Sequence, residues 1–214
     1  MATLIKKPVR SARKAKGDGH LRRAEILAAA ERIFVAEGYE GATIRKIADE
    51  VGVSSTALYM HFKDKDQILL EICTETVEQM LDSNTEIAAR PIDSVSRVRL
   101  ILEAYVRFGF EHPNAYRLVF CSPAAPLTEI RSEKHAAAAQ LGSDCYNRFA
   151  GVVREIAAEG RLRAGDDRTA AQTLWAACHG LITLVITKQD FNWAAPEVLT
   201  GVMLDGLLHG LTTD

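Results

Sequence analysis

The chain has 214 residues, of which 48% are hydrophobic and 25% are charged, a composition typical of a globular protein rather than a disordered one. No run approaches the roughly 20 apolar residues that cross a bilayer, and the basic N-terminus lacks the apolar segment of a secretory signal. A cytoplasmic protein without a membrane partner is therefore expected. The four cysteines lack the spacing of metal ligands, so no zinc site, other metal site or disulfide framework is expected.

The charges are unevenly distributed, although the net charge is only −2. Residues 1–66 contain 13 Lys or Arg and 9 Asp or Glu, a balance of +4, which leaves −6 for the rest of the chain. Nucleic-acid binding needs only a local basic patch, so the overall acidity does not exclude it.

Residues 1–20 are predicted to form a flexible basic arm, because this stretch has few large apolar side chains to bury. Its basic residues are Lys6, Lys7, Arg10, Arg13, Lys14 and Lys16. Two interpretations remain open, a solubilising tail and an arm that gains phosphate contacts on binding DNA.

The first helix is expected over residues 21–37, where Ile26, Ala30 and Phe34 recur at helical spacing. Gly38 should end this helix, because glycine adopts the left-handed conformation at little cost. A short second helix, "TIRKIADEV", should then begin after Thr43, whose hydroxyl is suited to an N-cap.

Gly52 should end the second helix, and Ser54 should cap a third helix that continues to about Met60. Asp64 then opens a fourth helix, on which an apolar stripe is predicted. Its members are Ile68, Leu69, Ile72, Val77 and Leu81.

Two short helices joined by a tight glycine-containing turn, with a longer helix before them, form a helix-turn-helix arrangement. The second helix of such a pair enters the DNA major groove, where short hydroxyl side chains allow a close approach and still offer hydrogen bonds. Groups at the far end of that helix can hold the sugar–phosphate backbone without reading the sequence. The predicted DNA-binding residues are Thr43, Arg45, Ser54, Ser55, Thr56, Tyr59, His61, Lys63 and Lys65.

The stretch "TIRKIADEVGVSSTALYMHFKDKDQIL" resembles the DNA-binding signature of TetR-type transcriptional regulators. Residues 58–69 match its "LY-x-HF-x-x-K-x-x-x-L" segment, and residues 21–69 fit the pattern without a gap. The resemblance implies a helix-turn-helix domain over residues 21–66, with the motif at about 44–63. One departure is Met60, where a second aromatic residue is common, and Met60 is therefore not included in the predicted site.

The rest of the chain, residues 67–214, is predicted to be an all-α regulatory domain, since no strand-like alternation occurs. Helices are expected over residues 92–111 and from Pro113 to Phe120, followed by a loop at "SPAAPLTE". A long helix should cover residues 129–160, and two further helices should cover about 168–189 and 196–212.

The last two helices are predicted to form a homodimer interface. The helix containing "TLWAACHGLITLVI" is apolar nearly all round and must be covered on both sides. Gly201, Gly206 and Gly210 each cost about 1 kcal/mol relative to alanine inside a helix, which close backbone approach would offset. TetR-like proteins generally dimerise through a four-helix bundle, which would present two recognition helices to a palindromic operator. A deep monomeric core is the alternative.

A TetR-like regulatory domain would also enclose a small-molecule pocket, and "LWAACHGL" resembles a subgroup with a Trp-x-x-x-His-Gly signature. Aromatic and polar residues on the middle helices suit a lipophilic or aromatic effector, although each is individually more typical of a core position. The candidates are Tyr105, Phe108, Tyr116, Phe120, Cys121, Tyr146, Trp175 and His179.

These features favour a ligand-responsive transcriptional regulator, most simply a repressor. An enzyme is disfavoured, because the sequence contains no nucleophile elbow, P-loop, zinc-protease motif or dinucleotide fingerprint, and no cofactor is expected. Two further alternatives are an architectural DNA-binding protein, which would show steep salt dependence without sequence preference, and a helical subdomain that binds no DNA.

Overall fold

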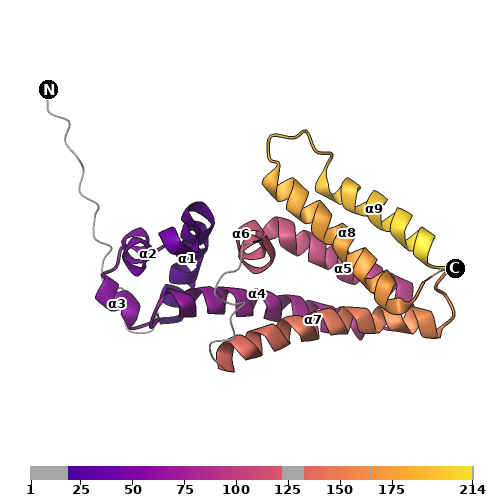
Figure 1. Cartoon of the computed structure of the whole chain (residues 1–214), viewed down its shortest axis with the longest axis horizontal. Helices are drawn as coiled ribbons and strands as arrows, with labels where there is room; N and C mark the ends of the chain where they lie inside the picture. Colours follow the sequence, from indigo (N-terminus) through magenta and orange to yellow (C-terminus); the bar gives the residue numbers. More distant parts are fainter. Residues whose placement is uncertain (1–18, 122–132, 164, 214) are drawn as a thin grey trace.

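A computed structural model describes residues 19–121, 133–163 and 165–213, and these residues form helices joined by turns and short loops (Figure 1). Residues 1–18 of the predicted arm lie outside the described residues, and so does the whole predicted loop at residues 122–129. The only strand-type pairing among the described residues is an isolated bridge between Leu162 and Thr212. The elements are α1 (Gly19–Gly41), α2 (Ile44–Val51), α3 (Ser55–Tyr59), α4 (Lys65–Ala88), α5 (Ser94–Glu111), α6 (Pro113–Tyr116), the π-helix η1 (Arg117–Cys121), α7 (Glu133–Ala158), α8 (Asp167–Thr187) and α9 (Pro196–Leu211).

The predicted helix boundaries in the N-terminal part are confirmed by their capping groups. Thr43 and Ser54 accept hydrogen bonds from the backbone N–H groups of Lys46 and Ala57, at 3.2 and 3.1 Å. Asp64 caps α4 in the same way. Gly38 interrupts α1 with a φ of 72°, a value that glycine adopts without strain.

Helices α1 to α3 enclose a small core together with the first half of α4. Ile26, Phe34 and Ile47 are buried there. Leu58 of α3 and Phe62, just after α3, are buried in the same core. The same cluster includes α4 residues as far as Cys73 and, from the π-helix, Leu118. The N-terminal domain is therefore packed on α4 rather than ending at its first turn.

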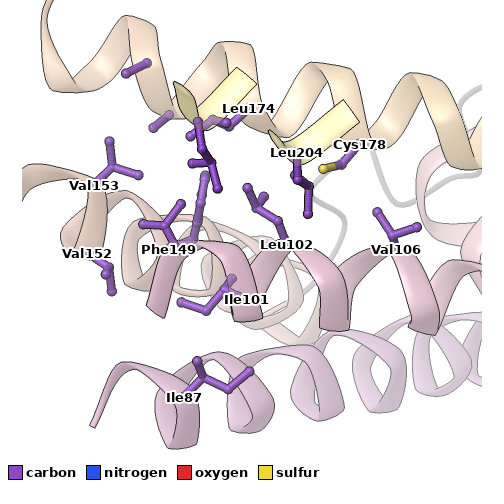
Figure 2. Close-up of a cluster of buried hydrophobic side chains, with 14 of the residues drawn as sticks. Ile87, Ile101, Leu102, Val106, Phe149, Val152, Val153, Leu174, Cys178 and Leu204 are labelled. Carbon is purple, nitrogen blue, oxygen red and sulfur yellow. The ribbon is translucent and has the colours of Figure 1, made fainter. Parts of the chain in front are cut away.

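The larger core lies between α4, α5, α7, α8 and α9. In Figure 2, Leu174 and Cys178 of α8 lie above Leu102 and Val106 of α5, and all four side chains are buried. Gly109 allows the close approach of α5 and α8, because a β-carbon at this position would lie only 2.6 Å from Ile182.

The predicted apolar stripe of α4 is corrected in its second half. Val77 and Leu81 are only half-buried, whereas Thr76, Met80 and Asn84 are buried. The shift follows from the change of partner along the helix, since α4 leaves the N-terminal core and packs along α7.

Helices α8 and α9 carry exposed apolar side chains, including Leu184, Val198 and Val202. Nothing lies within 4 Å of a β-carbon built on Gly201, Gly206 or Gly210. No other helix of the described chain therefore packs closely against α9 at these glycines.

Among the described residues, α8 is the one helix long and apolar enough to cross a membrane by length and composition. Core helices of soluble proteins meet the same criterion. The buried face of α8, formed by Leu174, Cys178, Ile182 and Ile186, packs in the larger core.

Candidate nucleic-acid interface and ligand cavity

The recognition helix α3 is short, and its position is set by one buried residue. Leu58 is fully buried, whereas Ser54 and Thr56 are exposed and Ser55 is half-buried. The hydroxyl groups therefore face outward from a helix that is anchored beneath them. The Ser54 oxygen also holds the first turn of α3, so it has a structural role in addition to its predicted DNA contact.

Helix α2 places Thr43 and Arg45 at its N-terminal end. The Arg45 side chain is 86% exposed, and its only ion pair in the described chain is a 3.9 Å contact with Asp49 on the same helix. Such an exposed pair contributes little energy, so the guanidinium can exchange Asp49 for a DNA phosphate.

Tyr59 ends α3, and the turn after it carries His61 and Lys63. The Tyr59 ring is 55% exposed, and Lys63 has no ion-pair partner among the residues described. The Lys63 backbone N–H donates to the Gln67 side chain at 2.8 Å, and this hydrogen bond fixes the turn that contains Lys63. The His61 carbonyl accepts a 2.8 Å hydrogen bond from Arg23, which attaches the same turn to α1. Next to Tyr59, Met60 is exposed and available to the same surface.

Lys65 has different surroundings from Lys63. Its ammonium group donates to the Tyr39 carbonyl at 2.8 Å and more weakly to the Ala42 carbonyl at 3.4 Å. It also lies 4.0 Å from the centroid of the Tyr39 ring, and only 24% of its side chain is exposed. The geometry therefore gives Lys65 a positioning role at the turn between α1 and α2.

Most other cations of this domain are already paired with carboxylates. Arg23 pairs with Glu71, Arg32 pairs with Glu50, and Lys46 pairs with Glu37. Arg45 and Lys63 are therefore the two predicted site residues with a cationic group most available to a phosphate.

A cavity of about 120 Å³ lies between α4, α5, η1, α7 and α8. Four of the eight predicted ligand residues line it, namely Tyr105, Phe120, Tyr146 and Trp175. The remaining lining residues were not among the predicted ligand residues. They are Val77, Met80, Asn84, Ile101, Leu102, Val119, Gly142, Cys145 and Phe149. A polar residue in an apolar helical stripe, Asn84, was the sequence signal that could have indicated α4.

The other four predicted ligand residues lie outside the lining of this cavity. Tyr116 is fully buried, and His179 lies directly beside it. The Phe108 ring packs against His112 with centroids 4.7 Å apart, and the Cys121 sulfur lies 3.9 Å from the Thr183 hydroxyl.

A chain of hydrogen bonds runs along the back of the cavity wall. Burial lowers the pKa of His179 and so favours the neutral imidazole, whose Nδ1 is hydrogen-bonded to the Tyr116 hydroxyl at 2.6 Å. Burial also raises the pKa of Tyr105 to about 12, so this phenol keeps its proton, and its oxygen is hydrogen-bonded to the Tyr116 oxygen at 2.8 Å. Trp175 Nε1 in turn donates to the Tyr105 oxygen at 3.2 Å.

No group of three or more potential metal ligands occurs in the part of the chain that the structure describes. The cysteines there are unpaired, and burial raises the pKa of Cys73 and Cys178 to about 12. Both thiols are therefore protonated core groups rather than thiolate ligands.

Two family models match the chain along most of its described length. Residues 26–72 match the model described as bacterial regulatory proteins, tetR family. Residues 98–212 match a tetracyclin repressor-like C-terminal domain, which alone spans more than half of the 214 residues. The chain belongs to the TetR family. TetR proteins are transcriptional regulators with an N-terminal helix-turn-helix domain, so this chain is a DNA-binding regulator and not an enzyme. The Trp-x-x-x-His-Gly subgroup stays a prediction.

Curated relatives include both activators and repressors. The chain is 33% identical over 99 residues to the transcriptional activator FasR of Mycolicibacterium smegmatis, a match that covers 46% of this chain and 45% of FasR. It is 27% identical over 198 residues to the transcriptional repressor KstR2 of Rhodococcus jostii, with 87% and 91% of the two chains covered.

The fold is also that of a solved structure, the regulator FadR from Bacillus subtilis in complex with stearoyl-CoA. The TM-score is 0.69 at 21% identity, and the match covers 87% of this chain and 98% of FadR. At this identity the similarity establishes the fold alone.

Proposed function

We propose that this TetR protein is a cytoplasmic repressor that binds a palindromic operator as a homodimer and is released by a small lipophilic or aromatic ligand. The observation that carries the proposal is a short segment shared by the cavity and the DNA-binding domain. Leu118 of η1 belongs to the N-terminal core, whereas its neighbours Val119 and Phe120 line the cavity.

Helix α4 provides a second connection between the two parts. Its first half, up to Cys73, packs in the N-terminal core, and its second half contributes Val77, Met80 and Asn84 to the cavity. A ligand that changes the packing of α4 and η1 would therefore change the position of the recognition helix. π-Helices are frequent at functional sites, which agrees with a role of η1 in this coupling.

The proposed dimer uses the exposed side of α8 and α9. Leu184, Val198 and Val202 supply apolar contact area, and the open β-carbon positions of Gly201 and Gly206 would allow two α9 helices to approach closely. A dimer would place two copies of α3 on half-sites separated by about one helical turn or a multiple of it.

A repressor that recognises a specific sequence is favoured over an architectural protein. The exposed surface of α3 presents hydroxyl side chains suited to base edges and not only cations suited to phosphates. The FasR relative is named as an activator, so activation is the second candidate for the output.

The test is reciprocal binding on a selected operator. Fragments bound by the protein are selected from random DNA, and compounds are then screened for release of the best fragment. By linkage, a compound that weakens operator binding by a given factor must itself bind more weakly by the same factor in the presence of operator. A protein whose DNA affinity is unchanged by every compound that binds the C-terminal domain would contradict the ligand-response part of the proposal.

A further inference from the structure

The cavity wall contains a tyrosine whose hydroxyl group has no partner in the described protein. Tyr146 of α7 lines the cavity, its oxygen is buried, and no described residue makes a hydrogen bond with it. Buried polar groups in folded proteins are nearly always hydrogen-bonded. The Tyr146 O–H is thus an unused donor on a residue that lines the cavity, and a bound molecule reaches it once the side chain turns toward the cavity.

The other polar groups of the wall offer no comparable donor. The Tyr105 hydroxyl is already hydrogen-bonded to Tyr116, and the Trp175 N–H donates to the Tyr105 oxygen. The Asn84 amide nitrogen faces the carbonyl oxygen and the sulfur of Cys145, at 3.4 and 3.6 Å. A ligand that satisfies the Tyr146 O–H therefore brings a hydrogen-bond acceptor.

The described lining contains no lysine, arginine, histidine, aspartate or glutamate. A carboxylate or an ammonium group inside it would lose its water without gaining a counter-charge, which is strongly unfavourable. The buried part of the ligand is accordingly neutral.

The volume limits the size of that part. An apolar cavity of roughly 150 Å³ holds a benzene molecule, and this cavity measures about 120 Å³. Tyr105, Phe120, Phe149 and Trp175 form aromatic walls, which suit one flat ring.

We propose that the cavity binds a neutral carbonyl compound whose buried part is about one ring in size, with its oxygen accepting a hydrogen bond from Tyr146. The effect of such a compound on operator binding rests on the proposed function, whereas its binding in the cavity does not. A larger effector would place only its carbonyl-bearing ring in this space.

Three probes of similar shape test the proposal: acetophenone, isopropylbenzene and benzoate. The full chain carrying Trp193→Phe leaves Trp175, in the cavity wall, as the single tryptophan reporter. Adding Tyr146→Phe should weaken acetophenone binding roughly three- to tenfold, the loss of one neutral hydrogen bond. Isopropylbenzene binding should change less than about twofold, since this molecule has no acceptor. Benzoate should bind most weakly to both proteins.

Tyr105→Phe is the matched control, because it removes from the same wall a hydroxyl that is already hydrogen-bonded to Tyr116. It should change the affinities for acetophenone and isopropylbenzene by the same factor. Thermal unfolding of each variant shows whether a lost affinity reflects a lost fold.

The proposal is overturned if none of the probes binds the folded protein, if Tyr146→Phe weakens both neutral probes equally, or if benzoate binds most tightly. Operator affinity of the same proteins is measured separately. Specific DNA binding with any of these three outcomes would leave the regulator intact and remove only the cavity assignment. Absence of specific DNA binding would contradict the proposed function without affecting the test of Tyr146.

Discussion

The Lys65 ammonium group lies 4.0 Å from the centre of the Tyr39 ring and donates to the Tyr39 carbonyl at 2.8 Å. This contact joins the start of α4 to the C-terminal end of α1, across 26 residues of chain. Lys63, two residues earlier, is exposed and makes no such contact among the described residues.

The two lysines should therefore respond differently to removal. Lys63→Ala should weaken DNA binding about equally on all sequences and lower the salt slope of log affinity by about 1, as expected for one lost phosphate contact. Lys65→Ala should lower the free energy of unfolding as well, with a smaller change in salt slope, because its charge already serves the protein. Affinities at several salt concentrations and urea unfolding measure both effects. Equal salt slopes in the two variants would contradict the positioning role of Lys65.

Two substitutions at Ser54 distinguish its role as a helix cap from its predicted contact with DNA. Ser54→Ala should cost about 1 kcal/mol of unfolding free energy, because the cap on the Ala57 N–H is lost. Ser54→Asp should keep most of that stability, since aspartate is an equally good cap, but should lower operator affinity at least about tenfold by bringing a negative charge to the phosphates. Urea unfolding and operator titration test this pair, and wild-type operator affinity in Ser54→Asp would remove Ser54 from the interface.

Two glycines in helices should respond to alanine with opposite signs. At Gly109 the new β-carbon would lie 2.6 Å from Ile182, so overpacking of about 1–3 kcal/mol should outweigh the gain of about 1 kcal/mol in helix propensity. Around Gly151 in α7 nothing lies within 4 Å, so Gly151→Ala should stabilise the protein by up to about 1 kcal/mol. Urea unfolding of both variants is the measurement. A Gly109→Ala protein more stable than the wild type would mean that α5 and α8 do not approach as described.

The His179 imidazole should make stability depend on pH. Burial holds its pKa in the folded protein below the ordinary value of 6.5, so the unfolded chain binds a proton more readily than the folded one. Stability from the neutral imidazole is present above pH 6.5 and decreases as the pH falls through the folded pKa. Wild type should therefore lose more unfolding free energy than His179→Gln between pH 7.5 and 5.5. Glu31 and Glu75, whose pKa values are raised by burial, contribute with the opposite sign in both proteins and cancel in the comparison. A larger loss in the glutamine variant would contradict the assignment.

Local signals made the N-terminal half predictable from sequence. A cap depends on groups three residues away, so Thr43, Ser54 and Asp64 could be assigned without knowledge of the tertiary structure. The buried face of α4 was predicted only in its first half, because the helix packs successively in two different cores.

The cavity was harder to predict because five separate segments build it. Tyr105 and Trp175 were identified by their chemistry, but the hydrogen bond between them joins residues 70 positions apart. The role of Lys65 depends on its distant contact with Tyr39, which no local pattern contains. The π-helical continuation of α6, over Arg117–Cys121, carries no turn or capping signal.

The most direct test of the central claim, that α3 lies in the major groove of both half-sites, uses a selected operator in which single guanines or adenines are replaced by their 7-deaza forms. The N7 acceptor faces the major groove, so its removal deletes one groove contact and leaves the phosphates unchanged. We predict symmetric losses of affinity at matching positions in the two half-sites. Unchanged affinity at every substituted position would contradict the account.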